Sequence, residues 1–294
     1  MSEHRPDRAM GLMVVAMLIL PGIDALAKAL GDTVTSTQIT WSRFFFQSLL
    51  MLPLALRASL PLFGPSISIH ALRGILLGIA TALFFHALKY LAIADAIAIF
   101  FIEPLVLTAL SALLLGESVG WRRISAVLVG FCGALIVIRP SFQEVGWPAL
   151  LPVGAAVCFA FYIVLTRRAA THEEPAQMQF LSGLFGCGFT TLLLGIGAWA
   201  EIPLMTPVLP TTIEWVGLFA LGAIATTGHM LVVYALKYAN ASVLAPFQYL
   251  ELVSATLLGW WFFADFPDAA TLTGAAIIVS SGLYVFHRER VLGA

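Results

Sequence analysis

The sequence is poor in charge. Only 11% of its 294 residues are Asp, Glu, Lys or Arg, while 60% are hydrophobic. A soluble protein of this length carries roughly a quarter of charged residues. A helix needs about 20 apolar residues to cross the hydrocarbon core of a bilayer, and apolar stretches of that length recur along the whole chain. The composition therefore predicts an all-α membrane protein with the lipid bilayer as its main surroundings.

Several patterns that would indicate other functions are missing. No basic run is longer than two residues and the net charge is −1, so we expect no nucleic-acid partner. The cysteines Cys132, Cys158 and Cys187 have no CxxC or Cys/His spacing, which argues against a disulfide framework or a metal site. The chain also lacks a nucleotide-binding Walker motif, HExxH and GxSxG. We therefore expect no cofactor and no catalytic residues.

Charged residues, Gly and Pro divide the apolar sequence into ten expected membrane-spanning helices. The first is retained rather than cleaved as a signal peptide, because its apolar part is too long and no Ala-x-Ala site closes it. The expected spans are 10–29, 35–56, 70–90, 92–115, 121–139, 148–167, 176–198, 212–236, 241–263 and 270–287.

The basic residues orient these spans, because Lys and Arg favour cytoplasmic loops. With a cytoplasmic N-terminus, the cytoplasmic side holds Arg5, Arg8, Arg57, Arg73, Arg122, Arg123, Arg167, Arg168, Lys237, Arg288 and Arg290. The opposite side holds Lys28, Lys89 and Arg139. The bias predicts that both termini are cytoplasmic, in the inner membrane of a bacterium.

The two halves of the chain share a repeated pattern. The tetrapeptide Ala-Leu-Lys-Tyr occurs at 87–90 and again at 235–238, an offset of 148 residues that also places Glu103 on Glu251. Five spans per half is an odd number, so the second half must enter the membrane in the opposite direction. We expect two inverted five-helix repeats, at 1–140 and 141–294.

The sequence resembles the EamA branch of the drug/metabolite transporter superfamily. Three stretches carry the resemblance: 38–57 with Arg43, 86–117 with Pro104 and Glu117, and 234–265, where the terminal Glu is replaced by Asp265. The resemblance implies ten helices in a five-plus-five inverted repeat around a central cavity. It also implies transport of a small metabolite.

Glu103 and Glu251 are the leading candidate site residues. Each lies near the middle of an expected span, where an ionised carboxylate costs about 2.5–3.5 kcal/mol on insertion scales unless it faces a cavity or a partner. They can bind a substrate amine or a proton, or they can be structural residues paired with a neighbouring helix. Gln248 lies one turn before Glu251 on the same helix face.

Arg43 cannot lose its charge within the second span, so it needs a neutralising partner. That partner can be a carboxylate, with Asp24, Glu103 and Asp95 as candidates, or an anionic substrate group, and the side chain can also extend to the outer surface. Asp24 and Lys28 are four residues apart, which predicts an ion pair within one helix. Aromatic and histidine side chains complete the candidate substrate site: His86, Tyr90, Phe100, Tyr162, His229, Tyr234 and Tyr249.

These features predict a secondary transporter that moves a small organic metabolite by alternating access, as a monomer or homodimer. The metabolite would resemble riboflavin, S-adenosylmethionine or an amino acid, and protons are a possible coupling ion. The alternatives are an intramembrane enzyme acting on lipid and a passive channel. Neither is favoured, because the motifs of the former and the polar rings of the latter are missing from the sequence.

Overall fold

The computed structural model describes residues 6–57, 66–103, 106–107, 109–110, 113, 121–169, 174–238, 247 and 250–292. All regular structure in these residues is helical, and no strand occurs among them. The helices are α1 (Pro6–Ile19), α2 (Pro21–Leu30), α3 (Ser36–Leu56), α4 (Ile67–Ala87), α5 (Ile93–Phe100), α7 (Trp121–Val145), η1 (Trp147–Leu150), α8 (Leu151–Ala169), α9 (Pro175–Ala200), α10 (Thr212–Tyr238), α12 (Leu250–Phe263) and α13 (Ala269–Leu292).

Within the described residues, six helical segments are long and apolar enough to cross a membrane. They are Asp7–Leu30, Ser36–Leu56, Ile67–Ala87, Trp147–Thr166, Ala176–Ala200 and Thr212–Ala235. Shorter apolar helices cover Leu128–Ile138, Leu250–Phe263 and Ala269–Ser281, which fall in the expected spans 121–139, 241–263 and 270–287. The expected span 92–115 begins as α5, and much of its second half lies outside the described residues. The prediction of an all-α membrane protein is confirmed.

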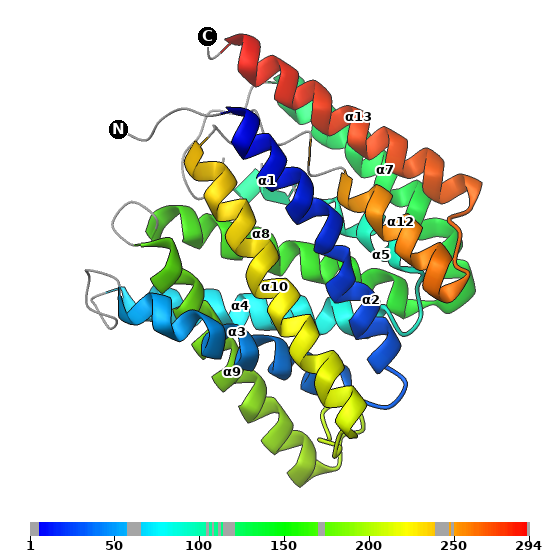
Figure 1. Ribbon diagram of the computed structural model, residues 1–294. Coiled ribbons are helices and arrows are strands. Elements are labelled where there is room, and N and C mark those ends of the chain that lie inside the picture. The colour runs from blue at the N-terminus through cyan, green and yellow to red at the C-terminus, as the bar shows by residue number, and fades with distance from the viewer. Residues whose placement is uncertain are drawn as a thin grey trace.

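The first span is interrupted at Leu20, between α1 and α2. Pro21 has no N–H to donate, so the helix loses one backbone hydrogen bond at this point. The chain stays helical at Leu20, whose N–H donates to Ala16 O at 2.9 Å, and continues as one apolar segment. Figure 1 shows α2 continuing from α1 across the bundle, away from the N-terminus.

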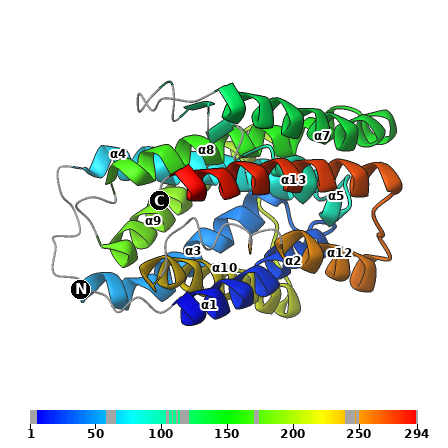
Figure 2. The ribbon, with the colours of Figure 1, turned by 90° about the horizontal axis from the view of Figure 1, so that it is seen from above.

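Helices far apart in the sequence pack against each other throughout the bundle. α3 packs on α9, α7 on α13, α4 on α8 and α9, and α10 on α1 and α3. Seen from above, α7 and α8 lie along one side and α1 and α10 along the opposite side (Figure 2). The beginning of α1 and the end of α13 lie at the same end of the bundle (Figure 1, Figure 2).

Glycines on α4 allow its close approach to α9. A Cβ added at Gly74 would lie 2.6 Å from Phe185 Cβ and 2.9 Å from Ser182 O, so only glycine fits this crossing. Gly78, one turn after Gly74 on α4, faces Phe189 of α9. This small-residue stripe is a packing device typical of membrane helices, which gain little hydrophobic free energy from association in lipid.

Candidate functional site

The candidate site is centred on Arg43 of α3. Arg43 is only 6% exposed, so its guanidinium does not extend to the surface. Nη1 donates a hydrogen bond to Thr81 Oγ1 of α4, and the guanidinium carbon lies 5.0 Å from the centre of the Phe44 ring. Nε has no hydrogen-bond partner among the described residues. A positive charge is thus held in the protein interior with part of its donor capacity unused.

Two carboxyl groups from opposite halves of the chain lie in this part of the bundle, and Asp24 is the one near Arg43. Asp24 of α2 lies within electrostatic range of both Arg43 and Glu251 of α12. Asp24 and Glu251 are half-buried, although both are surrounded by helices of the bundle. Charged side chains inside a membrane protein are expensive unless they face one another or a hydrated space. The structure therefore brings Asp24 near both Arg43 and Glu251 in the interior.

His229 and Tyr162 add polar groups next to Arg43. His229 of α10 and Tyr162 of α8 both lie within electrostatic range of the guanidinium. His229 Nδ1 lies 2.7 Å from Ala225 O. Because a carbonyl oxygen only accepts, Nδ1 carries the hydrogen, and Nε2 of the neutral ring is free to accept one. Six helices, α2, α3, α4, α8, α10 and α12, thus contribute to the cluster.

A row of aromatic rings leads up to Tyr162. Phe84 of α4 contacts Phe100 of α5 at 5.5 Å between ring centres, and Phe100 contacts Phe159 of α8 at 5.6 Å. Phe159 in turn lies 5.5 Å from Tyr162. Edge-to-face and tilted ring pairs of this kind form a rigid apolar surface. We refer to Phe84, Phe100, Phe159 and Tyr162 as the aromatic wall.

The structure places the remaining candidate residues in different surroundings. His86 is half-buried and packs edge-on against Tyr90 at 5.4 Å, while Tyr90 and Tyr234 are 47% and 44% exposed. Glu103 is half-buried just beyond α5. Gln248 and Tyr249 lie outside the described residues. Substrate contact by any of these side chains stays a prediction.

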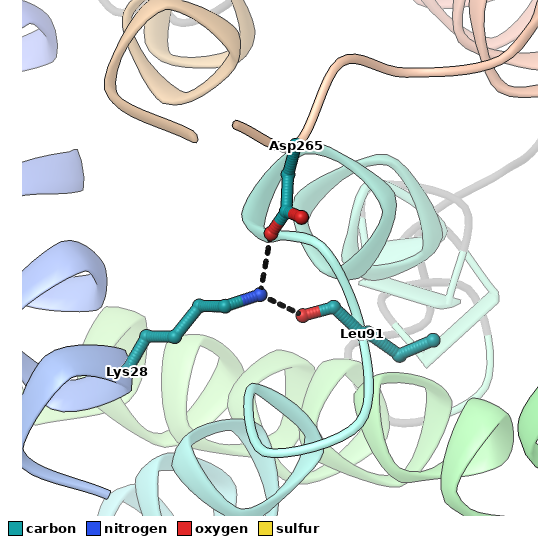
Figure 3. Close-up of polar contacts among 3 residues, drawn as sticks. All are labelled: Lys28, Leu91 and Asp265. Atoms are coloured by element: carbon teal, nitrogen blue, oxygen red, sulfur yellow. Dashed lines mark hydrogen bonds and ion pairs between the residues drawn. The ribbon is translucent and has the colours of Figure 1, made fainter. Parts of the chain in front are cut away.

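The predicted ion pair between Asp24 and Lys28 is wrong. Lys28 Nζ instead lies 2.7 Å from Asp265 Oδ2, beyond the end of α12, and donates to Leu91 O at 2.8 Å, between α4 and α5 (Figure 3). Its ammonium also lies 5.3 Å from the centre of the Phe263 ring. The side chain extends away from its own helix because two neighbouring segments, the end of α12 and the connection between α4 and α5, offer it partners.

Asp95, a candidate partner for Arg43, is engaged elsewhere. Its Oδ1 accepts a hydrogen bond from Thr271 Oγ1 of α13 at 2.8 Å. The bond connects the first turn of α5 to the first turn of α13. Asp95 therefore has a structural contact of its own, and Asp24 is the candidate that lies near Arg43.

Sequence reasoning missed one member of the cluster, Thr81. Asp24 is among the three candidate partners for Arg43 that the sequence offers, and the structure brings it near Arg43. Thr81 gave no signal, because a threonine in an apolar helix usually bonds its own backbone. Among the described residues, no three His, Cys, Asp or Glu side chains come together in a metal-binding arrangement.

A separate surface groove lies between α7 and α13. Its walls are apolar or hydroxyl-bearing and lack ionisable acids or bases: Ser125, Val129, Leu272, Thr273, Ala276, Ile277, Ser280, Ser281 and Tyr284. The groove offers shape but no charge with which to select a polar metabolite. We therefore place the candidate substrate site at the Asp24–Arg43–Glu251 cluster.

An apolar helical bundle with charged groups from many helices in its interior is the architecture of a multi-pass membrane transporter. The model of the EamA-like transporter family matches residues 7–139 and again 146–286. The chain belongs to this family, within the drug/metabolite transporters, and it is a transporter rather than an enzyme.

Curated relatives are named as transporters of several metabolites. An S-adenosylmethionine uptake transporter of Rickettsia bellii is 29% identical over 287 residues, which cover 95% of this chain and 94% of the relative. A riboflavin transporter of Vibrio cholerae is 33% identical over 187 residues, covering 64% of this chain and 60% of the relative. A pseudopaline exporter of Pseudomonas aeruginosa is 26% identical over 272 residues, covering 91% and 92%.

A solved crystal structure shares the fold. It covers 97% of this chain and 99% of its own, with a TM-score of 0.64 and 21% sequence identity. At this identity the similarity concerns the fold alone. The relatives' names, which include both uptake and export, support transport of small metabolites as the general function of this chain.

Proposed function

We propose that the protein is a secondary transporter that moves a small organic metabolite across the bacterial inner membrane by alternating access. The observation that carries the proposal is that Arg43 is buried inside an apolar bundle, with Asp24 of a second helix within electrostatic range of it and of Glu251 on a third. Such charges are costly in a membrane and are retained where they bind substrate or coupling ions. The sequence has no Walker motif, so an ion gradient or exchange is the driving force.

The packing of the helices supports two inverted halves of five spans each. In this arrangement α3 corresponds to α9, α7 to α13, α4 to α10 and α1 to α8. Exchanging the halves therefore leaves the pairs α3–α9 and α7–α13 unchanged and converts α4–α8 into α10–α1. Each of these pairs is in contact. It also converts α4–α9 into α10–α3, again a contacting pair. The two matches of the family model, 7–139 and 146–286, agree with a duplication near residue 140. Halves related in this way can rock about a site between them.

The ion pair between Lys28 and Asp265 supports the alternating-access part of the proposal. It joins α2 of the first half to the end of α12 in the second half, and the bond to Leu91 O adds the segment before α5. The bias of basic residues supports a position of this contact at the non-cytoplasmic face, with both termini in the cytoplasm. Opening the site to that face requires these bonds to break. The pair is therefore a gate contact.

S-adenosylmethionine leads the candidate substrates. The relatives named for its uptake match this chain almost end to end, whereas the riboflavin transporter of Vibrio cholerae matches 64% of it. Riboflavin and amino-acid-like compounds are the other candidates. Protonation of Glu103 or Glu251 is the coupling step that we propose, and the protein acts as a monomer or a homodimer.

Uptake into proteoliposomes tests the function. Wild-type protein should accumulate labelled S-adenosylmethionine or riboflavin in a saturable manner, and a pH gradient should change the rate. Glu103→Gln and Glu251→Gln should lower the rate and remove its pH dependence, while Glu144→Gln, at an exposed position of α7, should behave as wild type. Unchanged uptake by both Glu→Gln variants at every pH contradicts proton coupling. Unsaturable flux with electrical conductance contradicts a carrier and indicates a channel.

A further inference from the structure

We propose that the groove between α7 and α13 binds one anionic phospholipid, taken from the leaflet nearest the end of the bundle where α1 begins and α13 ends (Figure 1, Figure 2). One acyl chain occupies the groove, and the phosphate lies at the end of the groove where basic residues follow. The lining residues belong to other helices than the interior cluster, and lipid binding there is independent of the proposed transport function.

Two glycines bring α7 and α13 together beside the groove. A Cβ added at Gly133 of α7 would lie 2.9 Å from Gly274 O of α13, and one added at Gly274 would lie 2.6 Å from Gly133 O. On the side of this crossing nearer to the start of α7, that helix lines the groove with Ser125 and Val129. The groove has a volume of about 800 Å³, within the range of sites that bind small molecules.

The chemistry of the walls suits a hydrocarbon chain. Val129 and Leu272 are each about half exposed, so they present apolar surface to whatever lies in the groove. Two of the hydroxyl groups are already bonded within their own helix: Ser281 Oγ donates to a backbone oxygen at 3.1 Å and Thr273 Oγ1 to another at 2.6 Å. Because the donors of these hydroxyls are used, the walls offer a polar ligand little in exchange for its hydration.

The length of the groove matches one leaflet of a bilayer. Its lining residues on α13 run from Leu272 to Tyr284, which corresponds to about 18 Å at a rise of 1.5 Å per residue. Half of the hydrocarbon core of a bilayer is about 15 Å thick. Tyr284 is half exposed, and tyrosine is enriched at the level of the lipid headgroups. An acyl chain that follows the groove therefore has its headgroup beside Tyr284.

Both helices carry an arginine one turn beyond this end of the groove. Arg122 lies three residues before Ser125 on α7, which is a position on the lining face of that helix. Arg288 lies four residues after Tyr284 on α13, again on the lining face. The described residues that line the groove include no Asp or Glu. Basic positions next to a span attract anionic headgroups, so an anionic phospholipid matches the groove in charge as well as in length.

Native mass spectrometry tests the charge preference of the groove. The full-length protein would be released from nanodiscs that contain equal amounts of phosphatidylglycerol and phosphatidylcholine with identical palmitoyl and oleoyl chains. We expect wild-type protein to retain one phosphatidylglycerol in about tenfold or greater preference. Arg122→Gln and Arg288→Gln should each lower this preference about fivefold, the effect of one arginine near a membrane surface. Arg57→Gln, at the exposed end of α3, is the matched control and should leave the preference unchanged.

Variants that fill the groove test the position of the lipid. Ala276→Trp, at an exposed lining position, should lower the number of retained lipids by one, and Ala198→Trp, at an exposed position of α9, should not. Ser280→Phe, one turn further along the lining face, replaces Ala276→Trp if that variant does not fold. Equal retention of the two lipids by wild-type protein overturns the proposal, as does an unchanged lipid count in the filled variants. A dimer that Ala276→Trp dissociates would show that a second copy of the chain occupies the groove, which also overturns it.

Discussion

Lys28 Nζ and Asp265 Oδ2 lie 2.7 Å apart, although 237 residues separate the two positions in the sequence. Their side chains are 19% and 32% exposed, so the pair is neither buried nor fully in water. Partly exposed ion pairs contribute about 1 kcal/mol or less. A contact of this strength can hold two elements together and still release them during a transport cycle.

The first prediction concerns this gate contact. Asp265→Asn removes the ion pair, and a loss of about 1 kcal/mol should shift the ratio of closed to open states about fivefold toward open. Spin labels at the exposed positions Asp32 and Phe266 would measure the distance across the gate. We expect a longer, broader distribution in Asp265→Asn and partial recovery in the exchanged variant Lys28→Asp/Asp265→Lys. Identical distributions in wild type and Asp265→Asn would contradict a gating role.

The second prediction tests the packing of α4 on α9. Gly74→Ala places a methyl group 2.6 Å from Phe185 Cβ and 2.9 Å from backbone atoms of α9, so the helices must separate. Overpacking of this kind costs typically about 1–3 kcal/mol. Gly188→Ala in α9 is the matched control, because nothing lies within 4 Å of an added Cβ there. Thermal unfolding in nanodiscs should show a clear fall in Tm for Gly74→Ala and none for Gly188→Ala, and equal Tm values would contradict this packing.

The third prediction concerns the end of α9. Glu201 is exposed and has a φ of 52°, a left-handed conformation, and its N–H donates to Gly197 O. A residue with a Cβ loses about 1–2 kcal/mol in this conformation, whereas glycine adopts it freely. Glu201→Gly should therefore raise Tm. Ala198→Gly, in the last turn of the same helix, should lower Tm because glycine has a lower helix propensity than alanine. A rise in both variants would indicate a different cause.

The fourth prediction concerns the connection between α9 and α10. Gln38 of α3 bonds the backbone of Val208 twice, donating from Nε2 to Val208 O at 2.9 Å and accepting from its N–H at 2.8 Å. Gln38→Leu leaves both backbone groups without these partners. We expect faster hydrogen exchange around Val208 in that variant and unchanged exchange around the Trp41–Thr191 bond, which lies elsewhere on α3. Equal exchange at Val208 would mean that the loop is held by other contacts.

The general architecture could be predicted because a bilayer requires long apolar helices, and these are visible in the amino-acid composition. Apolar stretches of sufficient length indicate helices whatever their neighbours, and six of them appear at nearly the expected positions. The family could also be predicted from the region around Arg43 and the repeated Ala-Leu-Lys-Tyr, and the family match confirms it. The inverted arrangement of ten spans stays a proposal.

Side-chain partners were harder to predict, as Lys28 shows. Its spacing from Asp24 favours a pair within one helix, and only the bundle brings Asp265 and Leu91 O into reach. The sequence also offers Asp24 as a partner for Arg43, but it gives no reason to prefer Asp24 to Glu103 or Asp95, and only the packed bundle does. Glu251 was identified because its position repeats that of Glu103, and repeats preserve position without revealing contacts.

A ligand-bound structure by electron cryo-microscopy, with a compound that the protein transports into proteoliposomes, tests the central claim most directly. Substrate binding at the interior cluster predicts ligand density among α2, α3 and α12, in contact with Asp24, Arg43 or Glu251. Density confined to the groove between α7 and α13, with no contact to those three side chains, would contradict it.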